Sequence, residues 1–124
     1  MDAVLQIKNT EDSPEIVFDK NSGQLTITGK SLPEDAFGFY QPAIEWLSNY
    51  IKSPQQQTHV TFNLEYFNTA SSKQIFKLIS LLKELSKTHA VKITWHFDKG
   101  DKDMQASGER FSKLCQMPID VVQN

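Results

Sequence analysis

The stretch from His59 to Leu85 reads HVTFNLEYFNTASSKQIFKLISLLKEL and combines two kinds of apolar repeat. In its first part apolar and polar residues alternate, which is typical of a strand with one buried face. The residues expected on the apolar face are Val60, Phe62, Leu64 and Tyr66, opposite Thr61, Asn63 and Glu65. The second part, from Ser71 to Lys87, places apolar residues at helical spacing, at Ile75, Leu78, Ile79, Leu82 and Leu85. The stretch therefore predicts a strand followed directly by an amphipathic helix.

A second alternating segment, VKITWHFD (Val91 to Asp98), follows that helix. Strands that are covered on both faces read as continuous apolar runs, so these two segments predict a sheet with one apolar and one polar face. The helix between them can return over the apolar face as a right-handed crossover, which makes the two strands parallel. We therefore expect helices on one face of the sheet and a largely open face opposite.

Shorter signals complete the expected fold. EIVFD (Glu15 to Asp19) and QLTITG (Gln24 to Gly29) are strand-like, and the KNSG turn between them predicts a hairpin. A last helix is expected at about 101–116, followed by a short edge strand at IDVV. The predicted fold class is α/β: a two-layer sandwich with a mixed, four- to five-stranded sheet and helices on one face, in a single domain spanning residues 1–124.

The segment after the hairpin predicts an interrupted helix. Ser31 and Glu34 have capping-box spacing, and Pro33 fits the first turn. Because Pro42 lacks an N–H group and clashes with the preceding turn, we expect a kink or two successive helices, 35–40 and 42–51.

This segment also carries two apolar stripes, although a layer packed on one side needs only one. The first contains Phe37, Tyr40, Ile44, Leu47 and Ile51, and the second contains Phe39, Ala43, Trp46 and Tyr50. The second stripe either packs on a neighbouring helix or forms a protein contact surface, where exposed aromatic residues are favoured. The candidates for partner contact are Phe39, Trp46 and Tyr50.

Composition excludes several classes of function. The chain has 124 residues, 39% of them hydrophobic, and a formal charge of −2, so it lacks the basic excess that nucleic-acid binding requires. The first residues do not resemble a signal peptide, and no apolar run approaches the roughly 20 residues of a membrane span. We therefore expect a cytoplasmic protein without membrane insertion. The single cysteine, Cys115, cannot form an internal disulfide.

The sequence lacks the common signatures of catalysis and of metal or cofactor binding. The chain lacks the patterns GxGxxG, GxxxxGK[ST], GxSxG and HExxH. His59, His89 and His96 are scattered and show no zinc spacing with Cys115. The acidic loop DKGDKD fails the calcium-loop pattern, and Asp101 or Asp103 suffices as a helix cap. We accordingly predict no catalytic residue, metal or cofactor.

The junction FNTASS (Phe67 to Ser72) holds more helix-capping residues than one helix needs. Asn68, Thr69, Ser71 and Ser72 are all of types favoured at an N-cap, and one or two would be enough. Functional groups of open α/β sheets gather at the carboxyl ends of the strands, where this junction lies. A phosphate on Thr69 would meet the positive end of a helix dipole, with Lys73 one turn away. The residues alone permit phosphorylation at this junction without requiring it.

Four stretches resemble the SiaC family of bacterial regulatory phosphoproteins over nearly the whole chain. They are SPEIVFD, GQLTITGKSLPEDAFGFYQPAIEWLSNY, TFNLEYFNTASSKQIFKLI and ITWHFDKGDKDMQASGERF. The resemblance implies a non-catalytic switch in which a dedicated Ser/Thr kinase phosphorylates Thr69 and a PP2C-type phosphatase removes the phosphate. It also implies that the unphosphorylated form activates a diguanylate cyclase and so promotes cyclic di-GMP signalling and biofilm formation.

The same resemblance makes Asn68, Ser71, Ser72 and Lys73 the residues that support the phosphosite. The chain departs from the family pattern at Ala70, where a serine is common, and in MQASGERF, where the family carries more acidic residues. The second departure leaves open which cyclase or kinase is recognised.

The sequence is also compatible with two other functions. The strand, hydroxyl and helix order also resembles the STAS domain of anti-sigma-factor antagonists, so the predicted fold is STAS-like and the partner could be an anti-sigma kinase. The other alternative is a small enzyme with Thr69 or Ser71 as nucleophile, which would need a nearby base that the sequence does not identify.

Overall fold

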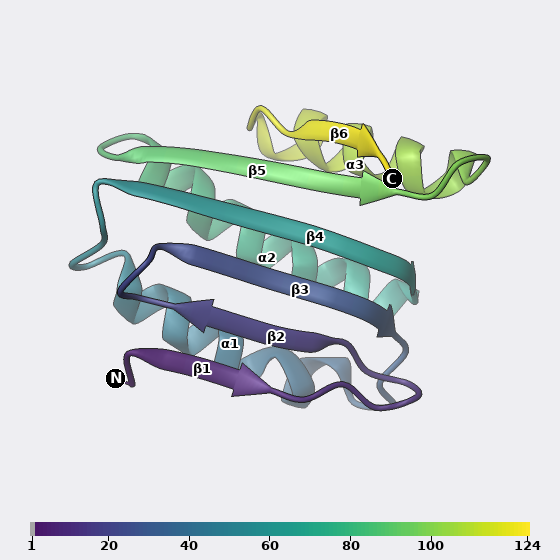
Figure 1. Cartoon of the computed structure of the whole chain (residues 1–124), viewed down its shortest axis with the longest axis horizontal. Helices are drawn as coiled ribbons and strands as arrows, with labels where there is room; N and C mark the ends of the chain where they lie inside the picture. Colours follow the sequence, from purple (N-terminus) through teal and green to yellow (C-terminus); the bar gives the residue numbers. More distant parts are fainter. Residues whose placement is uncertain (1) are drawn as a thin grey trace.

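The computed structural model describes residues 2–124 as one sheet covered on a single face by helices (Figure 1). Within these residues the sheet has six strands, in the order in which they occur along the chain. The strands are β1 (Val4–Ile7), β2 (Glu15–Asp19), β3 (Gln24–Ser31), β4 (Gln57–Phe67), β5 (Ala90–Phe97) and β6 (Asp120–Gln123). The helices are α1 (Ala36–Tyr50), α2 (Thr69–Ser86) and α3 (Lys102–Cys115).

The strands β1, β2 and β3 are antiparallel neighbours, whereas β3 to β6 run parallel. A helix joins each parallel pair, and all three helices lie behind the sheet in Figure 1. The predicted two-layer α/β sandwich with a mixed sheet is therefore confirmed. The prediction of four to five strands is wrong, because β1 was not foreseen. Its sequence VLQI is short and only partly buried at the sheet edge, so its pattern is weak.

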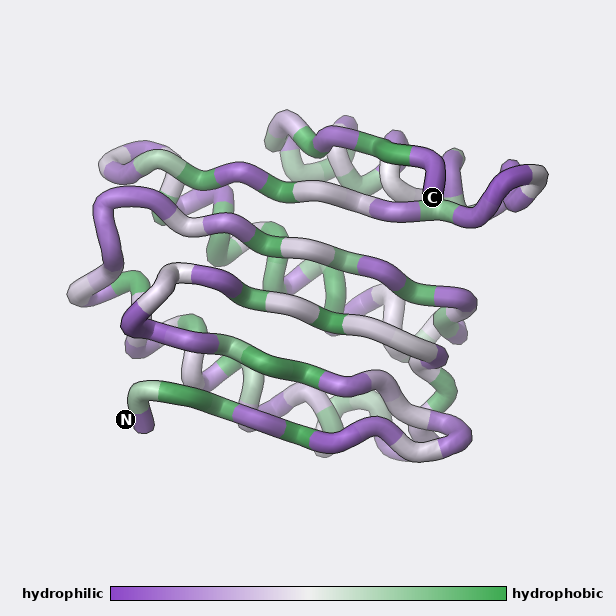
Figure 2. Tube along the Cα trace, viewed as in Figure 1, coloured by the Kyte–Doolittle hydropathy of each residue, from purple (hydrophilic) through white to green (hydrophobic). Residues whose placement is uncertain are grey.

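The alternation expected in the two central strands is confirmed over most of their length. The inward residues Val60, Phe62 and Leu64 of β4 and Ile93, Trp95 and Phe97 of β5 are buried. Figure 2 shows the change between hydrophobic and hydrophilic residues along these strands. On the opposite face, Thr61 and Asn63 are only partly covered. One face of the sheet thus forms the core with the helices, and the other stays open.

A register shift interrupts the alternation near the end of β4. Leu64 pairs with Gly29, but the next pair is Tyr66 with Lys30, so Glu65 is an extra residue in β4. Such a bulge reverses the side-chain phase of the residues that follow. Tyr66 consequently points outward with 56% exposure, and the prediction that it lies on the apolar face is wrong.

The helix α1 is continuous from Ala36 to Tyr50 and contains Pro42, so the expected split into 35–40 and 42–51 is wrong. Buried residues occur on both sides of Pro42, whose own side chain is exposed. Packing therefore outweighs the missing backbone hydrogen bond. The expected capping box is also wrong. Asp35 is the N-cap and accepts a hydrogen bond from the Gly38 N–H at 3.0 Å, while Ser31 ends β3 and is buried.

The third helix agrees closely with the expected range 101–116, and β6 lies where IDVV predicts a strand. The Asp101 carboxylate caps α3 by accepting a hydrogen bond from the Met104 N–H at 3.0 Å. Trp95 in turn donates its indole N–H to the Met104 carbonyl at 2.9 Å, which ties α3 to β5. Among the described residues, none of the helices is long and apolar enough to cross a membrane.

Candidate functional site

The junction of β4 and α2 is fixed by an asparagine cap at the carboxyl end of the sheet. Phe67, turned inward after the bulge, packs against Trp95 and Phe111 with ring centroids 6.0 and 6.1 Å away. Asn68 then accepts a hydrogen bond from the Ser71 N–H at 2.8 Å through its side chain. Its backbone N–H donates to the Ser31 carbonyl at 3.0 Å. These contacts set the direction in which α2 begins.

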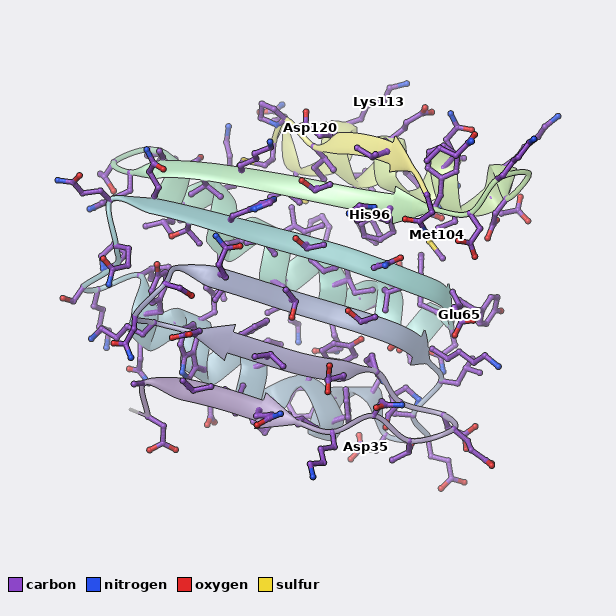
Figure 3. All side chains as sticks on the ribbon, in the orientation of Figure 1. Asp35, Glu65, His96, Met104, Lys113 and Asp120 are labelled. Atoms are coloured by element: carbon purple, nitrogen blue, oxygen red, sulfur yellow. The ribbon has the colours of Figure 1, made fainter. Side chains whose placement is uncertain are left out.

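Figure 3 shows this end of the sheet, where the labelled Glu65 side chain lies at the end of β4. Thr69, four residues further on, is the first residue of α2 and is exposed. The first N–H groups of a helix have no carbonyl partner within it and carry the positive end of the helix dipole. The Thr69 hydroxyl is therefore accessible at a position that stabilises a negative charge.

Ser71 is fully buried and belongs to a chain of hydroxyl groups beneath the first turn of α2. The Ser31 hydroxyl donates to Ser71 Oγ at 2.8 Å, and Ser71 Oγ donates to the Ser31 carbonyl at 3.1 Å. Because the Ser31 proton is used in this way, Tyr40 Oη donates to Ser31 Oγ across their separation of 2.6 Å. These hydrogen-bonded hydroxyl groups connect the end of β3, the second turn of α1 and the start of α2.

Burial keeps the phenol group of Tyr40 neutral. Desolvation raises the pKa of Tyr40 to about 12, although the neighbouring hydroxyl groups of Ser31 and Ser71 act in the opposite direction. Tyr40 thus remains a hydrogen-bond donor over the whole physiological pH range.

The other predicted support residues differ in exposure. Ser72 is half-buried, and its N–H donates to the Asn68 carbonyl at 3.0 Å. Lys73 is exposed one turn beyond Thr69. The structure therefore brings Asn68, Thr69, Ser71, Ser72 and Lys73 together at the N-cap and in the first two turns of α2. Their functional roles stay predictions.

The aromatic residues predicted for partner contact lie elsewhere. Tyr50 is fully buried and Trp46 is 5% exposed, so the prediction that they form a contact surface is wrong; Phe39 is half-buried. Trp46 packs on Phe18 of β2, with 5.5 Å between ring centroids, because α1 covers the antiparallel side of the sheet. The Tyr50 hydroxyl lies 2.8 Å from Thr58 Oγ1.

An apolar surface that sequence reasoning missed lies on the outer side of the helix layer. Its exposed members are Phe37 of α1, Phe76 of α2 and Leu114 of α3, with exposures of 58%, 41% and 60%. A groove of about 450 Å³ lies between α1 and α2, and one of about 470 Å³ lies between α2 and α3. Phe76 lines both grooves. We call these three residues and the two grooves the helix-face patch.

Comparisons with known proteins agree on one family. The model of the SiaC family, described as regulatory phosphoproteins, matches residues 7–124. The chain is 27% identical over 118 residues to an uncharacterized protein of Pseudomonas aeruginosa (strain UCBPP-PA14), covering 94% of each sequence.

Solved structures show the same similarity. The structure of SiaC of Pseudomonas aeruginosa matches with a TM-score of 0.89 and 26% identity, covering 99% of this chain and 100% of that one. A second match, with a TM-score of 0.90 and 26% identity, is to the structure of the diguanylate cyclase SiaD in complex with its activator SiaC, from the same organism. It covers 97% of this chain and 99% of the matched chain.

Proposed function

Because this chain belongs to the SiaC family of regulatory phosphoproteins, we propose that it is a non-catalytic switch that binds and activates a diguanylate cyclase. The active form is unphosphorylated, and phosphorylation of Thr69 releases the cyclase. The similarity to a SiaC chain solved with the cyclase it activates supports the choice of partner. Through cyclic di-GMP the switch promotes biofilm formation.

The observation that carries the proposal is the difference in exposure between the hydroxyl groups of the junction. Thr69 is exposed at the first position of α2, whereas the Ser71 hydroxyl is fully buried and bonded to Ser31. A kinase can reach the first without disturbing the core, but it can reach the second only if the start of α2 opens. Thr69 is therefore the phosphoacceptor in this proposal, with a Ser/Thr kinase adding the phosphate and a PP2C-type phosphatase removing it.

The site is suited to hold a phosphate once it is formed. The phosphoryl group adds a charge of about −1.5 to −2 next to the free N–H groups at the start of α2. Lys73, four residues later on the same helical face, supplies a positive charge. Asn68 and Ser71 hold the turn in place from below. The modification thus changes the charge of the surface while the fold beneath it stays the same.

The test measures cyclic di-GMP synthesis by a diguanylate cyclase of the native host in the presence of the purified protein. We expect stimulation by the wild type and by the control variant Ser72→Ala, and none by Thr69→Glu or by the phosphorylated protein. Mass spectrometry after kinase treatment is expected to find one phosphate, on Thr69. The proposal is refuted if the unphosphorylated wild type gives no stimulation. Phosphate on Ser72 would overturn the choice of acceptor.

A further inference from the structure

The helix-face patch contains side chains whose exposure the core does not explain. Phe76 of α2 lines both grooves, and Leu114 of α3 lines the one between α2 and α3. Phe37 of α1 lies beside them, with its ring next to Lys77, which lines both grooves. Contiguous exposed apolar surface of this kind marks interaction sites. We propose that the helix-face patch is the surface on which an acidic, amphipathic segment of the cyclase docks. This inference rests on the proposed function and names the surface that carries it out.

The patch is continuous with the proposed phosphosite. Thr69, Lys73, Phe76 and Ser80 follow one another at spacings of four, three and four residues, which places them along one face of α2. Ser72 and Lys73 also line the groove between α2 and α3. Phe76 lies seven positions after Thr69, which is about 10 Å along the helix axis. A segment that covers Phe76 therefore extends to the start of α2 within two turns.

The charges around the patch select an acidic partner. Lys73 and Lys77 line the groove next to Phe76, and Lys77 Nζ lies 5.0 Å from the centre of the Phe37 ring. Within residues 2–124, the ion pairs involve other lysines, Lys87 and Lys92. The far end of the patch is different, because the groove between α1 and α2 ends at Glu84, which is paired with Lys87. The carboxylates of the docked segment accordingly lie toward Thr69.

This arrangement explains how a phosphate on Thr69 would release the partner. The added negative charge pairs with Lys73 and repels the carboxylates of the docked segment. The distance of about 10 Å to Phe76 is close to the Debye length of about 8 Å at physiological ionic strength, so the phosphate acts mainly on the near end of the patch. Release therefore needs no change of fold, only the loss of charge complementarity beside the apolar contact.

The open face of the sheet is the rival surface. Within residues 2–124, its large exposed apolar residues are Val4, Tyr66 and Val122, which lie on β1, β4 and β6, strands that are not neighbours in the sheet. Its residues in the central strands include Thr61, Asn63 and Thr94, and His59 Nε2 lies 3.0 Å from Thr94 Oγ1. The exposed apolar residue Val122 lies on edge strand β6, paired with His96. Val122 is 40% exposed, which is close to the 41% of Phe76, so it offers a matched control position.

The experiment measures the affinity of the unphosphorylated protein for the purified cyclase by isothermal titration calorimetry. Phe76→Ser and Leu114→Ser are expected to raise Kd at least tenfold each, whereas Val122→Ser stays within twofold of the wild type. The double variant Lys73→Glu, Lys77→Glu is also expected to lose at least tenfold, and its binding should no longer weaken as salt is added. Thermal melts confirm that all variants are folded, which their surface positions favour.

The outcomes separate this inference from the proposed function. If the wild type binds the cyclase and both Phe76→Ser and Leu114→Ser bind equally well, the docking surface is wrong while the function stands. Loss of binding in Val122→Ser alone would move the interface to the sheet face. Absence of binding by the unphosphorylated wild type would overturn the function and this inference with it.

Discussion

The hydrogen-bonded hydroxyl groups of Ser31, Tyr40 and Ser71 lie beneath the first turn of α2. We expect that removing each of them lowers the free energy of unfolding by a different amount. Tyr40→Phe removes one hydrogen bond, and Ser31 Oγ keeps Ser71 as its partner, so the expected cost is about 1 kcal/mol. Ser71→Ala removes two hydrogen bonds, but the Ser31 carbonyl still accepts from the Asn68 N–H. We expect it to cost about 1–2 kcal/mol.

Ser31→Ala is expected to be the most damaging of the three changes. It removes the acceptor of the Tyr40 hydroxyl, which is fully buried and would be left without a partner. The lost bonds together with the desolvation of that hydroxyl cost about 2–4 kcal/mol. Adding Tyr40→Phe to Ser31→Ala removes the unpaired hydroxyl, so the double variant should be no less stable than Ser31→Ala alone.

Urea unfolding followed by the fluorescence of Trp46 and Trp95 measures these differences. With a slope of about 1.5 kcal/mol per M, a loss of 3 kcal/mol lowers the midpoint by roughly 2 M. The decisive comparison is the effect of Tyr40→Phe in the two backgrounds. If it destabilises the protein by the same amount with and without Ser31, the two hydroxyls are not coupled and the reasoning from their 2.6 Å contact is refuted.

Three further predictions concern the core and the helices. Gly108→Ala should destabilise the protein by about 1–3 kcal/mol in urea unfolding, because the added Cβ would lie 2.5 Å from Trp95 Cδ1. Glu109→Ala, on the exposed face of the same helix, is the control and should change stability little. The contribution of Tyr40 to stability should be constant below pH 10 and fall as the pH rises toward 12, because Tyr40 loses its proton first in the unfolded state. This contribution should disappear from the pH dependence of unfolding in Tyr40→Phe. Pro42→Ala should raise the melting temperature, since it restores an N–H donor within α1 at an exposed position, and an unchanged or lower value would contradict the role assigned to packing.

The sequence was sufficient to predict the fold where the burial of one face imposes a regular spacing of apolar residues. The alternation in β4 and β5 and the helical spacing in α2 gave the parallel pair, the covered face and the open face. It was insufficient where a single extra residue in a strand reverses the faces to which the following side chains point. Tyr66 and Phe67 are adjacent aromatics, and either fits an inward position, so only the pairing of β3 with β4 reveals the bulge at Glu65.

The aromatic residues of α1 illustrate a second limit. Both stripes are apolar, and the one that faces the core depends on how far the sheet extends beneath the helix. The edge strand β1 widens the sheet on that side, and the Trp46 indole N–H donates to the Asp2 carbonyl just before it at 2.9 Å. Because β1 was not foreseen, the sequence offered no reason to bury Trp46 and Tyr50. The exposed surface was therefore assigned to the wrong side of the helix.

The same bulge bears on the choice among the hydroxyl groups of the junction. By reversing the phase after Leu64, it turns Phe67 toward Trp95 and Phe111, and the chain enters α2 from that anchor. Ser71, two positions after Thr69, then lies on the buried side of the helix, and Thr69 lies outside. Chemical type cannot distinguish these residues, since all are good capping groups. What separates a structural hydroxyl from an accessible one is the rotation of α2 about its axis, and that rotation is set by the strand before it.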